Sequence, residues 1–272
     1  MDKDLSLQSW GRSNLFCYNT AIMKESFRTR LKRGDLLTGT LINLPAPEVA
    51  EILAEAGFDW LFIDMEHSQL DTPAAQLILQ AVDHRIDCVL RVALNDEIWL
   101  KKALDTGASG VMIPQVNSAE DARRAVRFCK YPPQGSRSVG LWRAAKYGTR
   151  LAEYLAEANH ETAVIVQVEH IQAVGNVESI IAVEGVDAVL VGPYDLSASM
   201  DHMGQVEHPD VQAAIQRVRQ ACQAQGMPLG IFATTAERAK VYIQQGYRLV
   251  TVGGDTLMLD SAAREILSKL RT

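Results

Sequence analysis

Two stretches, Ala163-Val-Ile-Val-Gln-Val-Glu169 and Ala188-Val-Leu-Val-Gly-Pro-Tyr-Asp195, decide the fold of this chain. Each begins with a short apolar run rich in β-branched residues, which is typical of a strand buried on both faces, the kind found in parallel sheets. A carboxylate follows each run, Glu169 in the first stretch and Asp195 in the second. Because the carboxyl ends of parallel strands meet at one edge, both acids are expected where barrel enzymes carry their active sites.

The same unit recurs along the chain, since short β-rich runs alternate with longer segments of helical periodicity. We expect eight strands, at Thr38–Ile42, Trp60–Asp64, Cys88–Val92, Gly110–Pro114, Val164–Val168, Ala188–Val191, Leu229–Phe232 and Leu249–Val252. Several helical segments end at a glycine, such as Gly57 or Gly226, where a left-handed cap falls. Eight β/α units predict an α/β fold, a closed (β/α)8 TIM barrel; the alternative, a doubly wound open sheet, lacks its Gly-x-Gly-x-x-Gly motif here.

The length and composition fit one barrel domain. The chain has 272 residues, 47% of them hydrophobic and 22% charged, which suits a single barrel. We assign residues 26–272 to this domain and residues 1–25 to an N-terminal arm, which either packs against another subunit or is a disordered tail. The longest interruption, Val116 to Ala163, is expected to lie over the barrel mouth, where long loops are often functional.

Charge, cysteine usage and hydropathy exclude several classes of protein. The formal net charge is −6 and no long basic run occurs, so neither nucleic acid nor an anionic membrane is an expected partner. The cysteines are far apart, which argues against disulfides and a thiolate zinc site and indicates a reducing cytoplasm; they are Cys17, Cys88, Cys129 and Cys222. The first turns contain no apolar stretch long enough for a signal peptide or a membrane span.

Glu169 and Asp195 are candidate metal ligands. They follow strands that are adjacent in a singly wound barrel, so their oxygens can converge on one cation, and oxygen ligands favour Mg²⁺ or Mn²⁺. Two protein ligands leave positions for water and substrate, as a Lewis-acid catalyst needs. The alternative interpretation is that both acids cap the helices that follow. Spacing alone leaves the two interpretations open.

The stretch Asp64-Met-Glu-His67 directly follows the second expected strand. A histidine held by a nearby carboxylate serves as a general base or acid near neutral pH, so His67 is a candidate catalytic residue. The alternative is a surface histidine in a polar turn.

Arg91 places a cation at the end of the otherwise apolar run Cys88-Val-Leu-Arg-Val. A buried charge needs an anionic partner. A substrate carboxylate or enolate can supply it through the planar guanidinium. The alternative is a buried salt bridge to Asp64 or Glu66.

Two common catalytic arrangements are missing. No lysine lies in or directly after an expected strand, so a Schiff-base mechanism has no obvious nucleophile. Lysines that lie in helical or loop segments include Lys101, Lys102, Lys130, Lys146, Lys240 and Lys269. No Gly-x-Ser-x-Gly elbow is present either.

Taken together, these residues resemble the 4-hydroxy-2-oxoheptanedioate aldolase family of metal-dependent class II pyruvate aldolases, which includes 2-keto-3-deoxy sugar acid aldolases and falls in the citrate lyase-like superfamily. The resemblance runs from about Arg28 to the C-terminus. It rests on Ala56-Gly-Phe-Asp-Trp-Leu-Phe-Ile-Asp64, Glu66-His67, Asn95-Asp96, Tyr131-Pro-Pro-Gln-Gly135, Gln167-Val-Glu169, Val183-Glu-Gly-Val-Asp187 and Gly192-Pro-Tyr-Asp-Leu-Ser197.

The resemblance implies roles at the two strand ends. Glu169 and Asp195 would hold the divalent ion, Mg²⁺ or Mn²⁺ with Co²⁺ as a third candidate. The pyruvate part of the substrate would contact Gln167, Gly192, Pro193 and Tyr194.

It also implies a catalytic group. His67 would be the base and Arg91 would stabilise the enolate, while Asp64 and Asp105 would orient and tune the histidine. Spacing alone would have made Asp105 a surface acid at a helix end.

The resemblance further implies a homo-oligomer, a hexamer, with a C-terminal helix exchanged between neighbours. Residues Thr256 to Leu270 have the apolar spacing for such a helix, although packing on their own barrel would explain it equally well. Tyr194 and the stretch Gly140-Leu-Trp-Arg-Ala-Ala-Lys146 depart from the family pattern, and both are expected near the mouth.

The expected activity is reversible retro-aldol cleavage of a 4-hydroxy-2-oxo acid into pyruvate and an aldehyde. A related carbon–carbon lyase or decarboxylase, acting on oxaloacetate or a malyl-CoA-like thioester, is the first alternative; no basic patch suits a coenzyme A phosphate. A barrel that binds a 2-oxo acid without turning it over is the second.

Overall fold

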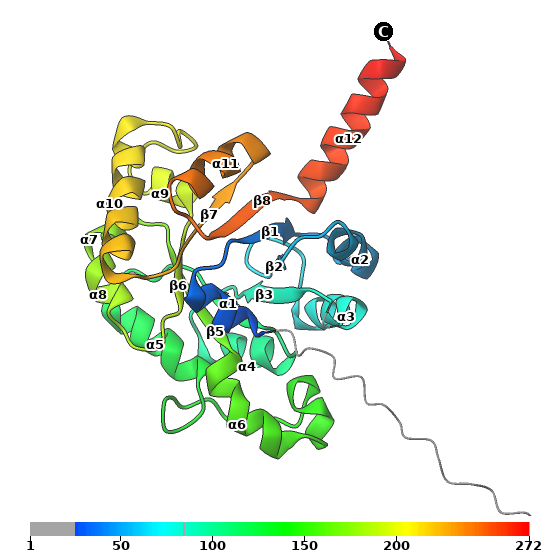
Figure 1. Ribbon diagram of the computed structural model, residues 1–272, viewed down its shortest axis with the longest axis vertical. Coiled ribbons are helices and arrows are strands. Elements are labelled where there is room, and N and C mark those ends of the chain that lie inside the picture. The colour runs from blue at the N-terminus through cyan, green and yellow to red at the C-terminus, as the bar shows by residue number, and fades with distance from the viewer. Residues whose placement is uncertain (1–24, 84, 272) are drawn as a thin grey trace, which may run out of the picture.

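The chain folds into a closed barrel of eight parallel strands, as predicted (Figure 1). The computed structural model describes residues 25–83 and 85–271, so nearly all of the predicted N-terminal arm lies outside the described residues. Each strand pairs with its neighbours in sequence, and β8 closes the barrel on β1. The strands are β1 (Leu37–Ile42), β2 (Trp60–Asp64), β3 (Asp87–Arg91), β4 (Gly110–Ile113), β5 (Ala163–Val168), β6 (Ala188–Val191), β7 (Leu229–Ala233) and β8 (Leu249–Gly254).

Helices surround the barrel and alternate with its strands. They are α1 (Phe27–Arg33), α2 (Pro47–Glu55), α3 (Thr72–Val82), α4 (Glu97–Asp105), α5 (Ala119–Cys129), α6 (Leu151–Glu161), α7 (Ile171–Gly175), α8 (Val177–Ile181), α9 (Pro193–Ala198), α10 (Pro209–Gln225), α11 (Ala236–Gln244) and α12 (Asp255–Leu270), with a 3-10 segment, η1, at Arg143–Gly148. Side-chain caps begin many of them just after a strand; Asp96, for example, accepts a hydrogen bond from the N–H of Ile98 at 2.9 Å.

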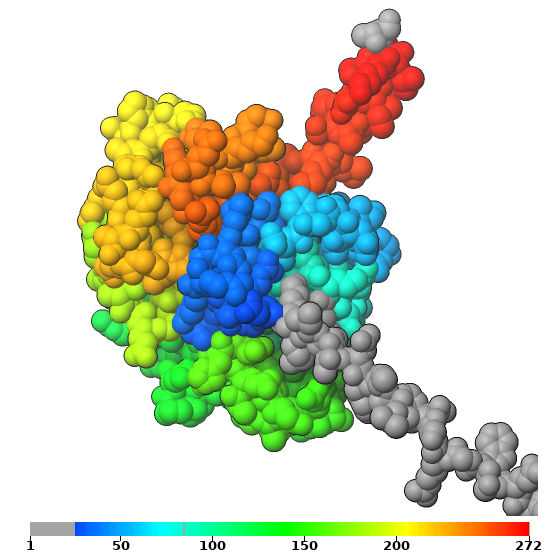
Figure 2. Space-filling view, viewed as in Figure 1, coloured from blue at the N-terminus to red at the C-terminus, as the bar shows by residue number. Residues whose placement is uncertain are grey.

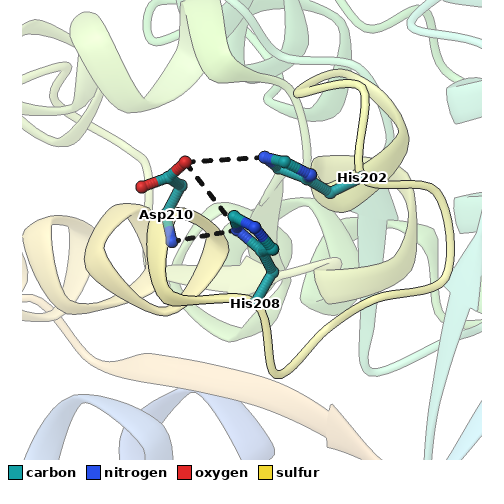
Figure 3. A group of neighbouring side chains, drawn as sticks. All are labelled: His202, His208 and Asp210. Carbon is teal, nitrogen blue, oxygen red and sulfur yellow. Dashed lines mark hydrogen bonds and ion pairs between the residues drawn. The ribbon is translucent and has the colours of Figure 1, made fainter.

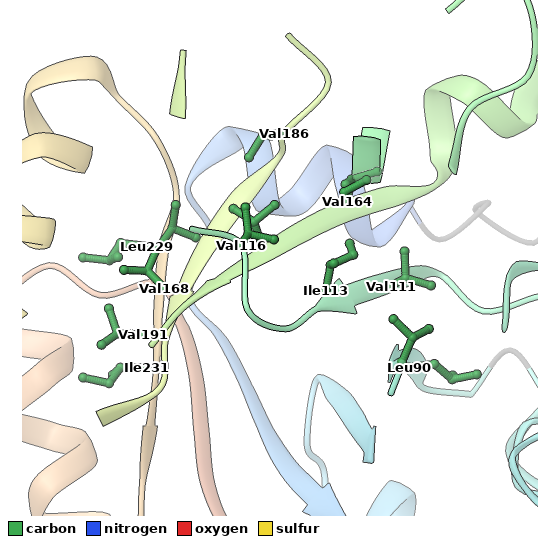
Figure 4. Packing of buried hydrophobic residues seen from close by; sticks show 14 of the residues in the cluster. Leu90, Val111, Ile113, Val116, Val164, Val168, Val186, Val191, Leu229 and Ile231 are labelled. Carbon is green, nitrogen blue, oxygen red and sulfur yellow. The ribbon is translucent and has the colours of Figure 1, made fainter. Parts of the chain in front are cut away.

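Two apolar cores hold the fold together. The larger core lies between the sheet and the surrounding helices, where side chains such as Val111, Val164 and Ile231 point outward from the strands (Figure 4). The smaller core fills the barrel and includes Trp60 from β2. Phe27 of α1 packs on Trp60 with ring centroids 5.9 Å apart. The unpredicted α1 therefore closes the amino-terminal end of the barrel.

The long segment between β4 and β5 does not lie over the mouth of its own barrel, so that expectation was wrong. Helix α5 starts beside the carboxyl end of β4 and runs the length of the barrel, which brings the chain after Cys129 to the opposite end. There Arg143 donates a hydrogen bond to the carbonyl of Thr106, just after α4, at 2.7 Å. The divergent stretch 140–146 is accordingly at the amino-terminal end and does not shape this chain's own mouth.

Helix α12 leaves the barrel and projects from it (Figures 1 and 2). Only its first residue, Asp255, is buried, and its carboxylate accepts the N–H groups of Asn43 and Leu44 at 2.9 and 2.8 Å. Further along, Leu259 is 65% exposed and Leu270 is 77% exposed. Packing against its own barrel therefore does not explain the apolar spacing of this helix.

Among the described residues, no helix is long and apolar enough to cross a membrane.

Candidate active site

A cavity of about 130 Å³ opens at the carboxyl ends of the barrel strands. Most of the predicted site residues line it, namely His67, Arg91, Gln167, Gly192, Pro193, Tyr194 and Asp195. Larger cavities of about 300 to 370 Å³ exist elsewhere on the molecule, but they do not gather this chemistry. Its position at the strand ends and its ionisable groups, rather than its size, mark it as the candidate active site.

Arg91 and Asp64 form a buried bidentate ion pair between β3 and β2. The Nε of Arg91 donates to Asp64 Oδ1 at 2.9 Å, and a terminal nitrogen donates to Oδ2 at 2.7 Å. Burial raises the pKa of Asp64, but the hydrogen bonds and charge of Arg91 outweigh burial and hold the pKa below its ordinary value. The salt-bridge interpretation is confirmed. It is compatible with a catalytic role, because the guanidinium also borders the cavity.

The same Asp64 carboxylate shapes the turn that carries His67. Its Oδ1 accepts the backbone N–H groups of Glu66 at 3.0 Å and of His67 at 3.3 Å. The imidazole lies beside a different acid, since His67 Nε2 is 3.6 Å from Glu66 Oε2. Asp64 thus positions the histidine through the backbone, and Glu66 is the carboxylate next to its ring.

Glu66 is a further candidate functional residue, which the sequence analysis named only as a possible ion-pair partner of Arg91. Its Oε2 is 3.2 Å from Arg91 Nε, within a side chain that is largely buried. Burial raises the pKa of this carboxyl group, the charge of Arg91 lowers it and the charges of Asp64 and Asp195 raise it, with the net result a pKa of about 7. The signal in the sequence was its place between Asp64 and His67.

Glu169 lies at the end of β5 in a tight polar cradle. Its Oε1 accepts the N–H of Gln115 at 2.8 Å, and its Oε2 accepts a hydrogen bond from the amide of Gln167. Gln115 has φ 54°, an uncommon left-handed conformation for a residue with a side chain, and this backbone aims its N–H at the carboxylate. Sequence reasoning did not identify Gln115, because its contribution is a backbone group.

Gly192 completes the cradle from the end of β6. A Cβ on this residue would lie 2.9 Å from Glu169 Oε2 and 2.9 Å from Gln167 Nε2. The Oε1 of Gln167 is buried and has no hydrogen-bond partner among the described residues.

Neither acid at the strand ends is a helix cap. His170 caps α7, and Gly192 occupies the cap position of α9 without a side-chain bond. Asp195 lies inside the first turn of α9. The helix-cap interpretation was therefore wrong for both Glu169 and Asp195.

The two acids influence each other electrostatically. Burial raises the pKa of Glu169 to about 7; the charges of Glu66 and Asp195 add to this rise, while the N–H of Gln115 and the charge of Arg91 oppose it. Three carboxyl groups and one arginine therefore share this end of the barrel.

Asp105 does not join this group within the chain. It ends α4, which runs from the mouth to the opposite end of the barrel, and its Oδ1 accepts a hydrogen bond from Arg137 at 2.7 Å. That arginine is buried and lies over the ring of Tyr131, 4.6 Å from its centroid.

Lys130 is buried and also lies at the amino-terminal end. Burial lowers its pKa to about 8, and its ammonium donates to the carbonyls of Asn159 and Thr162 at 2.9 and 2.7 Å. Lys130, the described lysine whose pKa is lowered, therefore lies at the opposite end of the barrel from Glu169 and Asp195 and is not placed to form a Schiff base there.

A parallel barrel that gathers carboxyl groups, an arginine and a histidine around a small cavity at its strand ends has the architecture of a TIM-barrel enzyme that acts on a small molecule. Residues 38–262 match the family model described as HpcH/HpaI aldolase/citrate lyase. The chain belongs to this family and is a carbon–carbon lyase of the aldolase type, which confirms the resemblance seen in the sequence.

Named relatives cover most of the chain. A 2-dehydro-3,6-dideoxy-6-sulfogluconate aldolase from Pseudomonas putida is 43% identical over 243 residues, covering 89% of this chain and 95% of the relative. A 4-hydroxy-2-oxo-heptane-1,7-dioate aldolase from Escherichia coli is 40% identical over 250 residues, covering 91% and 95%. A crystal structure of an HpcH/HpaI aldolase/citrate lyase family protein from Burkholderia cenocepacia J2315 has a TM-score of 0.87 at 40% identity, covering 90% of this chain and 98% of that one.

Proposed function

We propose that this chain is a divalent-metal-dependent, class II aldolase that reversibly cleaves a 4-hydroxy-2-oxo acid into pyruvate and an aldehyde. The observation that carries the proposal is that Asp195 lines a cavity together with Arg91, Gln167 and His67, while Glu169 lies directly behind it, hydrogen-bonded to Gln167. The names of the two curated relatives point to 2-oxo acids of the heptanedioate and deoxy sugar acid types as the substrate class.

The residues present fit a divalent cation. Burial and the charges of Glu66 and Asp195 raise the pKa of Glu169, so a cation bound at this carboxylate would offset the negative charge gathered there. The donors are oxygens, which favours Mg²⁺ or Mn²⁺, with Co²⁺ as a third candidate. Held by Glu169 and Asp195, such a cation would act as a Lewis acid on the 2-oxo group and would offset charge on the developing enolate.

His67 is the proposed general base. The imidazole is largely exposed at the mouth and lies beside Glu66, whose carboxylate can share a proton with it. It removes the proton of the C4 hydroxyl group, the C4–O bond becomes a carbonyl, and the C3–C4 bond breaks. The bonding electrons pass toward the C2 oxygen to give the enolate of pyruvate, which then takes a proton at C3.

Arg91 is the proposed partner of the enolate oxygen. Asp64 fixes the guanidinium by two hydrogen bonds, so it meets the developing charge without reorganising. Gln167, together with the Gly192-Pro193-Tyr194 segment, would contact the pyruvate part, and the free Oε1 of Gln167 is a group that substrate or water can satisfy.

We further propose a homo-oligomer, a hexamer, in which α12 is exchanged between neighbours. The leucines of α12 are exposed and only its first residue is buried. This exposure supports the exchange, because an apolar helix face in contact with water is unfavourable. Asp105 lies at the far end of its own barrel, so a tuning role for it would act on His67 of an adjoining subunit. Size-exclusion chromatography with light scattering tests the assembly, and a monomeric mass would refute it.

The activity is tested by coupling pyruvate release to lactate dehydrogenase, with a racemic 4-hydroxy-2-oxo acid as substrate and Mg²⁺ or Mn²⁺ present. We expect turnover that stops on chelation, returns on metal addition, and is lost in Glu169→Gln. Activity that survives chelation contradicts the metal-dependent mechanism. Turnover of oxaloacetate or malyl-CoA in place of the hydroxy acid would identify the related lyase, and binding of pyruvate without exchange of its C3 protons would identify a binding protein.

A further inference from the structure

A second group of potential metal ligands lies outside the candidate active site. His202, His208 and Asp210 come from the segment that joins α9 to α10 and from the first turn of α10 (Figure 3). Their donor atoms all lie within 4.8 Å of one another. We propose that these three residues form a second metal site, which binds a transition-metal ion of the Zn²⁺ class rather than Mg²⁺.

The spacing of the donor atoms is close to that of a coordinated ion. His202 Nε2 lies 3.5 Å and His208 Nδ1 lies 3.7 Å from the same oxygen, Asp210 Oδ2. Ligands held about 2.0–2.1 Å from a tetrahedral Zn²⁺ are roughly 3.4 Å apart. The three donor atoms, all within 4.8 Å of one another, give three ligand positions once the rings reorient, and water can fill the fourth.

The Nδ1 of His208 is unprotonated, because it accepts the backbone N–H of Asp210 at 3.3 Å. Its single lone pair serves that helix cap, so a metal ion at Nδ1 takes the place of this hydrogen bond. The rings of His202 and His208 are stacked, with centroids 3.6 Å apart and planes 19° apart, so one ring has to rotate for both lone pairs to meet one ion. Both side chains are partly exposed, at 26% and 31%, which leaves room for that rotation.

The charges around the group favour a cation that prefers nitrogen. Asp210 has no lysine or arginine partner among the described residues; its ion contacts are the two imidazoles. The neighbouring acid, Glu207, forms an ion pair with Arg238, with Oε1 2.8 Å from a terminal guanidinium nitrogen. The amino end of α10 disfavours positive charge, and the carboxylate of Asp210 offsets this effect. Two imidazoles and one carboxylate select Zn²⁺, Cu²⁺ or Ni²⁺ over Mg²⁺.

An ion bound by these three residues would link the end of α9 to the start of α10. The N–H of His202 donates to the carbonyl of Ser197 at 2.9 Å, and the Ser197 hydroxyl donates to the carbonyl of Tyr194 at 2.6 Å. His202 is thus tied to α9, whereas His208 and Asp210 begin α10. Metal binding would therefore stabilise the connection behind the candidate active site, which appears as a higher melting temperature.

The test uses the full chain in excess Mg²⁺, which occupies oxygen ligands and competes poorly for imidazole. Cu²⁺ is titrated and followed by electron paramagnetic resonance, and Zn²⁺ is titrated and followed by thermal melting. We expect one Cu²⁺ per chain with hyperfine splitting from two nitrogens, and a melting temperature that rises with Zn²⁺.

Three variants remove one donor each while keeping the local structure. His202→Phe retains a stacked ring, His208→Asn retains a good helix cap, and Asp210→Asn retains shape. Each should weaken binding by at least about tenfold, and each histidine variant should reduce the nitrogen splitting to one nucleus.

His170→Asn is the matched control, because His170 Nδ1 caps α7 by accepting the N–H of Gln172 at 3.1 Å, and among residues 25–83 and 85–271 no second imidazole stacks on it. Mg²⁺-dependent pyruvate release and circular dichroism verify that every variant is folded. Unchanged binding in His202→Phe or His208→Asn, a single coordinating nitrogen in the parent chain, or no stoichiometric ion beyond Mg²⁺ overturns the proposal.

Discussion

Replacing Gly192 by alanine should disable the candidate metal centre without unfolding the barrel. The added Cβ would lie 2.9 Å from Gln167 Nε2 and from both the Cβ and Oε2 of Glu169, whereas ordinary contacts begin at 3.4 Å. The backbone of Gly192, at φ −97° and ψ 89°, does not itself resist a side chain. The strain therefore falls on Glu169 and Gln167, which have to retreat.

The size of the effect follows from these distances. The difference between 2.9 and 3.4 Å requires the Glu169 side chain, from its Cβ to its carboxylate, to move by about 0.5 Å. A displacement of about 1 Å at a catalytic group costs roughly 100-fold in rate, so we expect kcat/KM to fall by about 10- to 100-fold. Overpacking costs about 1–3 kcal/mol, which lowers the melting temperature by several degrees and leaves the chain folded.

The assay measures pyruvate release and, separately, the Kd for Mn²⁺ by electron paramagnetic resonance. Gly175→Ala is the matched control, since Gly175 is in α7 and its added Cβ would meet no atom within 4 Å. We expect the control to retain activity and metal affinity. A Gly192→Ala enzyme with parental kcat/KM and parental Mn²⁺ affinity would falsify the assignment of Glu169 and Gln167 to the site.

Three further outcomes are expected. Arg91→Met leaves Asp64 buried and unpaired, so chemical denaturation should show a loss of about 3–5 kcal/mol; adding Asp64→Asn should restore stability but not turnover, and recovered turnover would contradict the role of Arg91. The pKa of Glu169 is about 7 in the metal-free fold against an ordinary 4.5, so between these values the folded chain holds a proton that the unfolded chain lacks. Stability of the metal-free chain should therefore fall as pH rises through this window, and Mn²⁺ affinity should rise by up to about tenfold per pH unit and level off above pH 7; an affinity independent of pH would count against the ligand. Ending the chain after Gly254 removes α12 and should lower the mass measured by light scattering, whereas an unchanged assembly would show that α12 does not mediate it.

Part of the candidate site was predictable from the sequence, because the apolar pattern of each strand shows which residue stands at the strand's carboxyl end, at the mouth of the barrel. Once β5 and β6 are recognised as parallel strands, Glu169 and Asp195 must stand at the carboxyl end of adjacent strands. The same argument places Arg91 and Asp64 together, since they are partners in the register of β2 and β3.

The position of the long segment after β4 was not predictable from length alone. A long connection can lie at either end of a barrel, and the outcome depends on where α5 is placed within it. Because α5 comes first, the remainder lies at the amino-terminal end. Asp105 is a second example. Its match to the family motif does not reveal that it forms an ion pair with the buried Arg137 at the end of the barrel opposite the mouth.

The sequence by itself determined the eight β/α units, the barrel, and the strand ends at which acids and a cation would meet, because those follow from the alternation of apolar and polar residues along one dimension. Tertiary structure decided which neighbours these groups have. It set Glu66 rather than Asp64 beside the His67 ring, aimed the N–H of Gln115 at Glu169, and stacked His202 on His208. Such pairings depend on distances between segments remote in sequence or on backbone angles, and neither is encoded in residue spacing.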